Sequence, residues 1–547
     1  MPEPQISAYR WWQIFLPDRG GWFFCYLLFG MLFVRPELLL WDGGSCRHII
    51  NGVLMLQTHN IPRDNYTSWA NPNIECLTRS WLADFISGAF YQQAHLIGVV
   101  FICGAVIALG LTWSYQMGRA RGLGLLSGLL VLAVVMATVG VHWSARSHVY
   151  SYLPFLVVYY LFFIAPAGWW RVGVGAVTMC LWTNAHGSFA IGMGMIAVKL
   201  AGDLYALVRR NPLAAAEFKC DLLAGVAAFL ASCINPRGIG LYTAVFGYLT
   251  NPNVVHKTDE WRSFDIFAGV GSFGFLVLLA LVLALLIKAR KVPSLAEAVL
   301  FCGLVLGGFE SMRLIPYAAL IAMPLTGPAW HELRQRVRSQ ENQASSDAPA
   351  AVDGSSAPET DSKSGSPASL KAKSNGLARI VQLEERGEAQ EKNGLKMSIA
   401  CLAIALVMGV VAMSASFFAV KDFDAERLPV DAVNYMQQHH IAEQHGFNYD
   451  NWGGYIYFKT GERVDFKTGE RVFIDDWGDF LPPGFIDQYL QIILTRPGWE
   501  KAFKQWDFRW VLVPNESQLA QMLSQSPDWQ VAEKDKTAVL LVRKDGR

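Results

Sequence analysis

Long apolar segments separated by short polar ones dominate the first 420 residues of the chain. A helix needs about 20 apolar residues to cross the hydrocarbon layer of a membrane, and the pattern predicts about eleven crossings. The predicted spans are Gly21–Leu40, His95–Trp113, Leu123–Val141, Val149–Trp169, Val172–Thr183, Ser188–Val208, Leu222–Ile234, Val270–Ile287, Leu295–Gly308, Leu314–Trp330 and Met397–Val420.

The basic residues between these segments predict their orientation. With the N-terminus in the cytoplasm, every short cytoplasmic connection contains Lys or Arg, as the positive-inside rule requires. These connections hold Arg119, Arg121, Arg171, Arg209, Arg210, Lys219, Lys288, Arg290, Lys291 and the stretch Arg334–Arg338. The outside connections are then 41–94, 142–148, 184–187, 235–269, 308–313 and everything after Lys421.

The chain therefore divides into a membrane body, a linker and a tail. Residues 1–330 form the predicted body, with the large first outside loop at 41–94. Residues 331–396 are rich in Ser, Ala, Glu, Lys and Gly, which predicts a disordered cytoplasmic linker with a short surface helix over Leu370–Gln390. A regulatory tail is the alternative interpretation of this linker. A last span, 397–420, leads to residues 421–547 on the outer side.

Residues 421–547 have the pattern of a small soluble α/β domain. The predicted helices are Pro429–His440, Pro483–Leu494 and Gln518–Ser524, and the predicted strands are Tyr455–Phe458, Arg471–Ile474, Trp510–Val513 and Ala538–Val542. The segment FKTGERV occurs at Phe458–Val464 and again at Phe466–Val472. Because the copies are shifted by an even number of residues, an extended strand keeps its facing, and we interpret the duplication as a lengthened hairpin.

Composition supports a membrane protein and excludes one class of partner. The 547 residues are 52% hydrophobic and 17% charged, and the mean hydropathy is +0.26. The charged fraction is below the roughly 25% of soluble domains. The net charge of +1 argues against a nucleic-acid partner, since phosphate binding needs a basic surface. Residues 1–20 lack the basic start and cleavage site of a signal peptide, so the first span is expected to remain as an anchor.

Cysteine usage leaves one pairing open. Most cysteines fall within the predicted spans, but Cys46 and Cys76 both lie in the first outside loop. An oxidising compartment would allow these two to form a disulfide, and a pair of free thiols is the alternative. No cluster with zinc-binding spacing occurs in the sequence.

The first outside loop carries the most informative motifs. It contains Trp41-Asp42 directly after the first span, then His48, Asn51-Gly52, the run Ile61–Tyr66 with Asp64, and Trp81-Leu82. Asp42 is expected at the water–lipid boundary, where the headgroup of a lipid-linked substrate would be presented. A carboxylate there can accept a proton from an incoming hydroxyl. The alternative is that Asp42 only caps a helix that begins near Gly43.

Taken in order, these motifs resemble the GT-C superfamily of multi-span glycosyltransferases that use polyprenyl-phosphate sugar donors. Further patches agree with a group of large bacterial members: Arg146-Ser147-His148, Trp182–Gly187, Asn235–Gly238, Glu260-Trp261, Arg313 ahead of Pro316, Asn451–Tyr455 and Val472–Asp475. The resemblance covers most of the chain except the linker. It implies a mainly α-helical membrane bundle with a small C-terminal α/β domain, in the bacterial inner membrane with the domain in the periplasm.

The resemblance also implies roles for individual residues. Asp42 would be the catalytic base, and Asp64 a second acid for the acceptor or a metal. The candidates for binding the donor and its phosphate are His48, Arg146, His148, Asn184, His186, Arg237, Glu260 and Arg313. Arginine suits this role because its planar guanidinium matches phosphate oxygens. The implied partners are a polyprenyl-phosphate-linked sugar, membrane lipid, and a glycan, lipid or protein acceptor. No cofactor is assigned, and a divalent metal stays open.

The chain departs from the group at two places. Gly43-Gly44 stands where an aromatic pair is usual, and Asp475-Asp476-Trp477 stands where Asp-Gly-Arg is usual.

Several candidate residues also have plain structural interpretations. Asn184 and His186 would satisfy each other at a helix break, and Glu310 and Arg313 would form an ion pair. Glu260 with Arg262 would be surface charges. Asn451–Gly454 would be a tight turn, or would present Trp452 to a sugar ring.

Two other functions compete with sugar transfer. A transporter or flippase of lipid-linked glycans would carry charges within several spans and internally related halves, neither of which is prominent here. A non-catalytic envelope assembly factor would keep its activity in the isolated tail.

Overall fold

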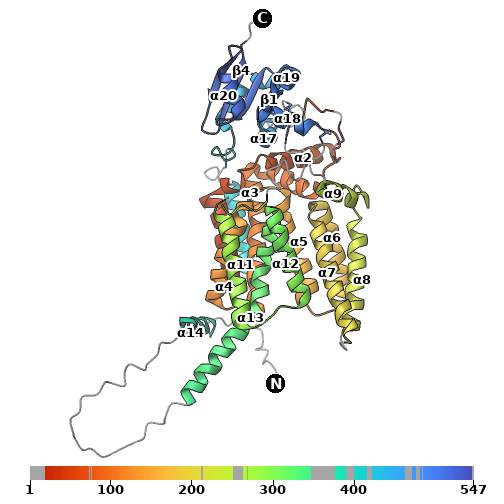
Figure 1. Ribbon diagram of the computed structural model, residues 1–547, viewed down its shortest axis with the longest axis vertical. Coiled ribbons are helices and arrows are strands. Elements are labelled where there is room, and N and C mark those ends of the chain that lie inside the picture. The colour runs from red at the N-terminus through yellow and green to blue at the C-terminus, as the bar shows by residue number, and fades with distance from the viewer. Residues whose placement is uncertain are drawn as a thin grey trace, which may run out of the picture.

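A computed structural model describes residues 19–72, 74–75, 77–210, 214–250, 263–267, 269–346, 376–389, 399–414, 420, 422–461, 471–475, 481–482 and 484–544. A bundle of long, roughly parallel helices forms the body, and the C-terminal domain sits at one end of it (Figure 1). The short helix α14 lies at the opposite end (Figure 1). Helices α2 and α9, which carry or follow described loop motifs, lie at the end that faces the domain.

Each predicted span coincides with a helix in the described part of the chain. The body consists of α1 (Arg19–Phe29), η2 (Gly30–Val34), η3 (Pro36–Leu39), α2 (Gly44–Thr58), α3 (Trp81–Ala120), α4 (Leu125–Val139), η4 (Gly140–His142), η5 (Ser147–Ser151), α5 (Tyr152–Tyr159), η6 (Tyr160–Ile164), α6 (Trp170–Ala185), α7 (Phe189–Val208), α8 (Ala214–Ser232), α9 (Gly240–Thr250), α11 (Val270–Ala289), α12 (Leu295–Glu310), η8 (Met312–Leu314), α13 (Ile315–Ser346), α14 (Gly376–Ala389) and α15 (Ile399–Ser414).

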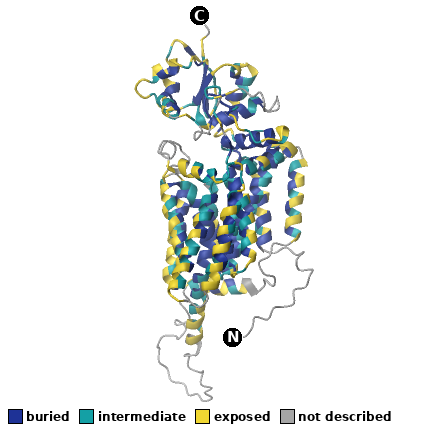
Figure 2. Ribbon diagram, turned by 90° about the vertical axis from the view of Figure 1, so that its right-hand side faces the viewer, coloured by how far each residue is buried: buried dark blue, intermediate teal, exposed yellow. Residues whose placement is uncertain are grey.

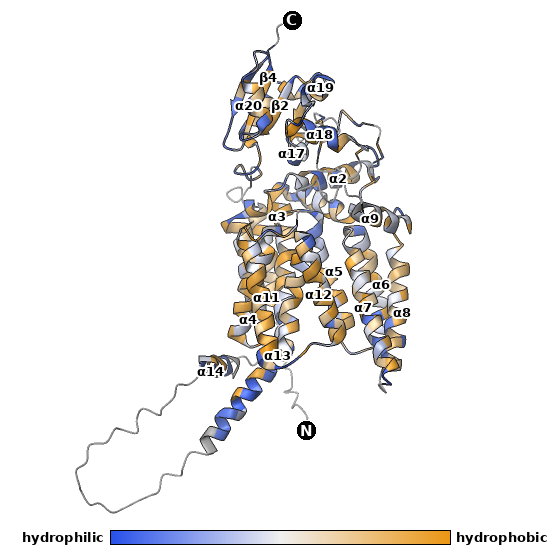
Figure 3. Cartoon of the chain, viewed as in Figure 1, coloured by the Kyte–Doolittle hydropathy of each residue, from blue (hydrophilic) through white to orange (hydrophobic). Residues whose placement is uncertain are grey.

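The outer surface of the bundle is apolar. Large hydrophobic side chains are exposed on several helices, among them Val177, Leu230, Leu306 and Leu406. Figure 2 shows many exposed residues on the outside of the bundle, and Figure 3 shows that the helices of the bundle are mostly hydrophobic. Four described helices are long and apolar enough to cross a membrane by themselves: Trp81–Ala120, Ser147–Ile164, Phe189–Val208 and Val270–Ala289. A surface of this kind is stable in lipid and not in water.

The longest helix, α3, is two helices in sequence. Ala94 (φ −148°) and His95 (φ 53°) have non-helical backbone angles and break it. The part before the break packs against α2, and the part after it begins where the sequence predicted the span His95–Trp113. The break therefore lets one continuous segment form both the outside layer and a membrane crossing.

Polar contacts join segments that the charge pattern placed on the same side. At the end away from the domain, Arg121 lies 2.5 Å from Glu297, and Arg171 pairs with Asp221. At the domain end, Arg237 donates to the Leu77 carbonyl at 2.9 Å and Trp81 donates to Asn184 at 2.6 Å. The alternation of loops is thus consistent with the predicted topology.

Part of the predicted linker is helical. Helix α13 continues through residues 331–346, and α14 covers Gly376–Ala389 within the range predicted for a surface helix. Glu384 of α14 is buried and accepts from the Ser127 backbone N–H (2.7 Å) and the Trp330 indole N–H (3.0 Å). The expectation of disorder is wrong for residues 331–346, and the expected short helix is confirmed by α14. Residues 347–375 and 390–398 lie outside the described residues.

The C-terminal domain is a small α/β unit. Its elements are α16 (Val430–Gln438), η11 (Ile441–Glu443), β1 (Gly446–Asn448), α17 (Asp450–Gly461), α18 (Phe485–Ile493), α19 (Trp499–Lys504), β2 (Trp510–Pro514), α20 (Gln518–Ser524), β3 (Trp529–Lys534) and β4 (Ala538–Arg543). The sheet has the order β1-β2-β4-β3; β1 and β2 are parallel, and the other two pairs are antiparallel.

Most elements predicted for this domain are confirmed, and two are wrong. The segment Tyr455–Phe458, predicted as a strand, lies in helix α17, whose residues 452–458 are all buried. Arg471–Ile474 contributes one isolated bridge at Val472 and no strand of the sheet. The first FKTGERV copy starts at the end of α17 and not in a hairpin; residues 462–470, which hold most of both copies, lie outside the described residues.

The first outside loop is built into the C-terminal domain. Ser68 pairs in parallel with Val472, through Val472 N–H to Thr67 O (2.8 Å) and Trp69 N–H to Val472 O (3.0 Å). The Trp69 ring stacks on His445 at 4.2 Å and packs against the domain's aromatic core. The domain therefore contains a piece of the membrane body's loop, and the predicted boundary at residue 421 does not separate two independent units.

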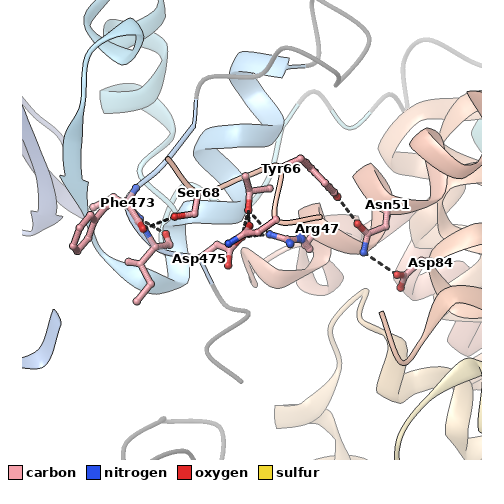
Figure 4. A network of polar contacts seen from close by, with 11 residues as sticks. Arg47, Asn51, Tyr66, Ser68, Asp84, Phe473 and Asp475 are labelled. Atoms are coloured by element: carbon pink, nitrogen blue, oxygen red, sulfur yellow. Dashed lines mark hydrogen bonds and ion pairs between the residues drawn. The ribbon is translucent and has the colours of Figure 1, made fainter. Parts of the chain in front are cut away.

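A buried ion pair reinforces this junction (Figure 4). Arg47 on α2 pairs with Asp475 of the domain, and both side chains are almost completely buried. Thr67 donates to the same carboxylate and accepts from Arg47 at 2.5 Å. Tyr66 lies under the guanidinium, 5.1 Å from ring centroid to Cζ, and its hydroxyl donates to Asn51. Asn51 in turn donates to Asp84 at 2.9 Å, so polar contacts run from the domain into the body.

Two glycines permit the close approach of α17. A Cβ on Gly43 would lie 2.0 Å from the Asn451 carbonyl oxygen, and one on Gly453 would lie 2.1 Å from the Ile474 oxygen. Neither position accepts a side chain without movement of the backbone. Gly43 stands where the group usually has an aromatic residue, and the lack of a side chain there leaves room for helix α17.

We predict that Asp475→Ala destabilises the junction by about 3–5 kcal/mol, because it leaves the Arg47 charge buried without its partner. Limited proteolysis and thermal unfolding of the full chain in detergent would measure the loss. Asp507→Ala is the matched control, since Asp507 is an exposed acid of the same domain that pairs with Arg509 and Arg543. Equal proteolysis and melting of the two variants would contradict the prediction.

Candidate functional site

The candidate residues gather where α2, η5 and the α6–α7 connection meet, beneath the C-terminal domain. Helix α2 lies across this end of the bundle, and almost all of its residues are buried between the body and the domain (Figure 1). Asp42 stands just before α2, Arg146 and His148 stand at the start of η5, and His186 follows α6. Segments distant in sequence therefore bring one acid and several bases to one place.

Asp42 forms an ion pair with Arg146. The Arg146 Nη1 atom lies 3.2 Å from Asp42 Oδ2 and 3.5 Å from Oδ1. Asp42 Oδ1 also accepts from the Gly44 backbone N–H at 2.9 Å, at the first residue of α2. The contact with Gly44 supports the interpretation of Asp42 at the start of a helix, and the role of Asp42 as a base stays a prediction.

The electrostatic surroundings keep Asp42 ionised. Burial favours the neutral acid and would raise its pKa, but Arg146, the Gly44 N–H and His148 act against burial. Their combined effect holds the pKa of Asp42 below its ordinary value. Asp42 is therefore a carboxylate at neutral pH, and a weak base while Arg146 faces it.

Two histidines lie side by side next to this pair. The rings of His148 and His186 are 6.5 Å apart between centroids. His148 Nε2 donates to the His142 carbonyl at 2.8 Å, and His186 Nδ1 accepts from the Ser188 N–H at 3.1 Å. These contacts orient both rings and leave His186 Nε2 as the proton-bearing nitrogen of the neutral ring.

The pKa of His186 is lowered by several of the candidate residues. Burial lowers that pKa well below its ordinary value, and His148, Arg313, His48 and Arg146 act in the same direction. The candidates from the first loop, η5 and η8 are thus close enough to influence one ring. A cluster of this composition, with several positive or protonatable groups around one buried imidazole, suits an anion.

His142 lies close to Arg313 and His148, although the sequence analysis assigned it no role. Burial lowers its pKa to about 4, and the charge of Arg313 acts in the same direction. The His142 Nε2 atom is buried without a hydrogen-bond partner. Its position in the same short connection as Arg146 and His148 was the available signal in the sequence.

His48 is held by a buried acid that the sequence analysis also missed. Its Nδ1 lies 2.6 Å from Asp84 Oδ1, and Asp84 is fully buried. The Asp84 carboxylate accepts from three further side chains at 2.9–3.1 Å: Asn51, Thr78 and Ser80. Because Nδ1 faces Asp84, the other ring nitrogen of His48 is turned away from the acid. An acid within an apolar helix was the signal that would have indicated Asp84.

Some predicted site residues make contacts that hold loops together. Asn184 accepts from Trp81 and donates to the Cys180 and Ile234 carbonyls, both at 2.8 Å, so it does not pair with His186. Arg237 donates to Leu77 O. Asp64 is exposed, and its backbone bridges to Glu75. Trp452 is 3% exposed and donates to Arg427 O at 3.2 Å, which excludes the interpretation of its ring as a sugar platform.

Two expectations fall outside the described residues. Glu260 lies in the segment 251–262, and Cys76, the proposed partner of Cys46, is also not described. Among the described residues, no group of three or more His, Cys, Asp or Glu side chains is placed to hold a metal ion.

We predict that Arg313→Gln raises the pKa of His142 above about 4, because it removes a nearby positive charge. The pKa stays below its ordinary value, since burial remains. Histidine NMR titration of the full chain would measure the change, with the His142 signal assigned from a His142→Gln sample. Arg35→Gln, an exposed arginine paired with Glu37, is the control and should leave that signal unchanged. An unchanged pKa in Arg313→Gln would separate Arg313 from the cluster.

Comparison with known proteins adds information on the fold. No protein-family model matches the chain, and no curated protein sequence matches it. Among solved structures, oligosaccharyltransferase AglB from Archaeoglobus fulgidus, in complex with an inhibitory peptide and a dolichol-phosphate, is similar with a TM-score of 0.53 and 9% identity. The match covers 92% of this chain and 70% of that chain.

A second structure, ArnT from Cupriavidus metallidurans bound to undecaprenyl phosphate, matches with a TM-score of 0.48 and 13% identity, over 96% of this chain and 98% of that chain. At identities this low, similarity establishes the fold alone. The match to AglB shows that the chain shares the fold of this oligosaccharyltransferase, in agreement with the GT-C-like membrane bundle expected from the motifs.

Proposed function

We propose that this protein transfers a glycosyl group from a polyprenyl-phosphate carrier to an acceptor hydroxyl at the membrane surface that carries the C-terminal domain. The observation that carries the proposal is the meeting of one ionised acid, Asp42, with Arg146 and the neighbouring histidine cluster. Sugar transfer from a lipid phosphate needs both kinds of group, a base for the acceptor and cations for the leaving phosphate.

The fold supports this substrate class. The AglB structure that shares the fold contains a dolichol-phosphate, which is a polyprenyl phosphate. In the present chain the apolar bundle ends at the candidate site, so a lipid tail can remain in the hydrocarbon while its phosphate reaches Arg146. We assign this surface to the periplasmic side of the bacterial inner membrane, because the basic connections lie at the opposite end.

The proposed reaction is a direct displacement at the anomeric carbon. The acceptor oxygen forms the new bond to that carbon as the bond to the phosphate oxygen breaks. The acceptor proton passes to Asp42, and the electron pair of the broken bond stays on the polyprenyl phosphate. Inversion at the anomeric carbon is what the resemblance to the superfamily implies.

The cations and histidines act on the leaving group. Arg146 and Arg313 offer guanidinium N–H groups to phosphate oxygens. His48, His148 and His186 surround the same region. Hydrogen bonds hold their rings: His48 to Asp84, His148 to the His142 carbonyl, and His186 to the N–H and hydroxyl of Ser188. The His186 Nε2–H is in place before the reaction, because Nδ1 accepts from Ser188, and it stabilises the charge that develops on the phosphate with little rearrangement.

Other residues act on geometry. Asp84 orients His48 and joins it, through Asn51 and Tyr66, to the junction with the C-terminal domain (Figure 4). Asn184 fixes the end of α6 against α3 and thereby positions the connection that holds His186. Both are positioning residues in this proposal.

We predict that Asp42→Asn reduces transfer by at least about 100-fold, because an amide cannot accept the acceptor's proton. Mass spectrometry of envelope glycolipids and glycoproteins from an Asp42→Asn strain, beside a deletion strain and the wild type, would identify the missing product. Glu37→Gln is the control, since Glu37 is an exposed acid of the preceding η3 helix that pairs with Arg35. Normal products in the Asp42→Asn strain would remove Asp42 from the mechanism and end this proposal.

A further inference from the structure

The Asp42–Arg146 pair concerns how Asp42 becomes free to accept a proton in the proposed reaction. The residue proposed as base forms an ion pair with a residue proposed to bind phosphate. Asp42 Oδ1 has the Gly44 N–H at 2.9 Å, and Arg146 Nη1 lies within 3.5 Å of both carboxylate oxygens. Both carboxylate oxygens of Asp42 are therefore in contact with a donor.

We propose that Arg146 is shared between Asp42 and the donor, and that the lipid-linked phosphate draws Arg146 away from Asp42, so that the base becomes available only in the donor complex. This inference rests on the proposed function and specifies how its site is regulated. It assigns Arg146 two successive partners, first the carboxylate and then the phosphate.

The geometry permits such an exchange. The Arg146 and Asp42 side chains are each 17% exposed, whereas those of Arg47 and Asp475 are 0% and 2% exposed. The contact distances of 3.2 and 3.5 Å are also longer than those of a tight charge-assisted pair, roughly 2.7–2.9 Å. The Asp42–Arg146 pair thus opens at low cost, while the Arg47–Asp475 pair at the junction stays closed.

The charges of the reaction favour the same exchange. A sugar joined to a polyprenyl phosphate is a phosphodiester with one negative charge. After transfer the polyprenyl phosphate is a monoester with up to two, while Asp42 has taken the acceptor's proton and is neutral. One negative charge therefore moves from Asp42 to the phosphate, and Arg146, standing between them, interacts more strongly with the phosphate as the reaction proceeds.

The basicity of Asp42 follows the position of Arg146. Arg146 and His148 face Asp42 from η5, and Arg427 of the C-terminal domain lies over the adjoining Trp41 ring at 4.6 Å. Burial alone raises the pKa of Asp42, and Arg146 is the strongest influence that lowers it. Transfer of Arg146 to the phosphate, and the negative charge of that phosphate, both raise this pKa and make Asp42 a better base.

The test is the binding of undecaprenyl phosphate to the purified full chain. Asp42→Asn keeps the shape of the side chain but removes the charge that competes for Arg146. We expect it to bind undecaprenyl phosphate roughly 5-fold more tightly than the wild type, in proportion to the loss of a partly exposed ion pair. Asp42→Ala removes the same competitor and serves where the Asn variant is poorly folded. Glu37→Gln should bind as the wild type does.

A double-variant cycle separates sharing from simple repulsion between two anions. In an Arg146→Gln background, Asp42→Asn should tighten binding by less than about 2-fold, because no shared guanidinium remains. Tightening of equal size in both backgrounds would show repulsion alone and overturn the inference. Unchanged or weaker binding by Asp42→Asn and Asp42→Ala would overturn it as well.

The outcomes also distinguish this inference from the proposed function. Wild-type transfer by Asp42→Asn, or no binding of undecaprenyl phosphate by the wild-type chain, would end both. Loss of transfer without tighter binding would leave Asp42 as the base and end only the sharing of Arg146.

Discussion

The buried pair between Arg47 and Asp475 determines how the rest of the site is arranged. It joins the C-terminal domain to α2, the helix that also carries His48 and begins next to Asp42. Two charges removed from water need each other, since a lone one would cost several kcal/mol. With Thr67, Tyr66 and Asn51 around it, the pair keeps α2 in one register between the domain and the bundle. The positions of Asp42 and His48 follow from that register.

This junction also bears on what the C-terminal domain is for. Trp69 of the first outside loop packs among the aromatic side chains of the domain core, and Val472 pairs with Ser68. An isolated tail lacks Trp69, so it lacks part of its own core. This arrangement argues against an assembly factor whose tail acts alone. It favours a domain that holds the first outside loop of a membrane enzyme in place.

The sequence predicted the bundle because its signal is local. Runs of apolar residues such as Val270–Ala289 identify a membrane helix without knowledge of any neighbour. Helix α17 was missed for the opposite reason. It is buried on every side from Trp452 to Phe458, so its sequence shows no 3.6-residue periodicity, and its aromatic residues favoured a strand. Its helical form depends on close contacts with Gly43 and with Ile474, far along the chain.

Only part of the candidate site could be predicted, because the contacts of a side chain with distant segments cannot be read from the sequence. Motif order indicated Asp42, Arg146, His148, His186 and Arg313, which the structure brings near one another. Asn184 and Arg237 belong to the same motifs, but they hold loops, and only their partners reveal this. Asp84 and His142 were missed, because a buried acid or imidazole gains its meaning from side chains that approach it in the fold.

The central claim is that a lipid phosphate is bound between Arg146, His186 and Arg313. The most direct measurement is an experimental structure of the full chain in lipid nanodiscs with undecaprenyl phosphate. The account predicts phosphate density in contact with Arg146 and bordered by His186 and Arg313, with the lipid tail running along the bundle. Phosphate bound at the end of the bundle that carries α14, or a donor lipid that never reaches Arg146, would contradict it.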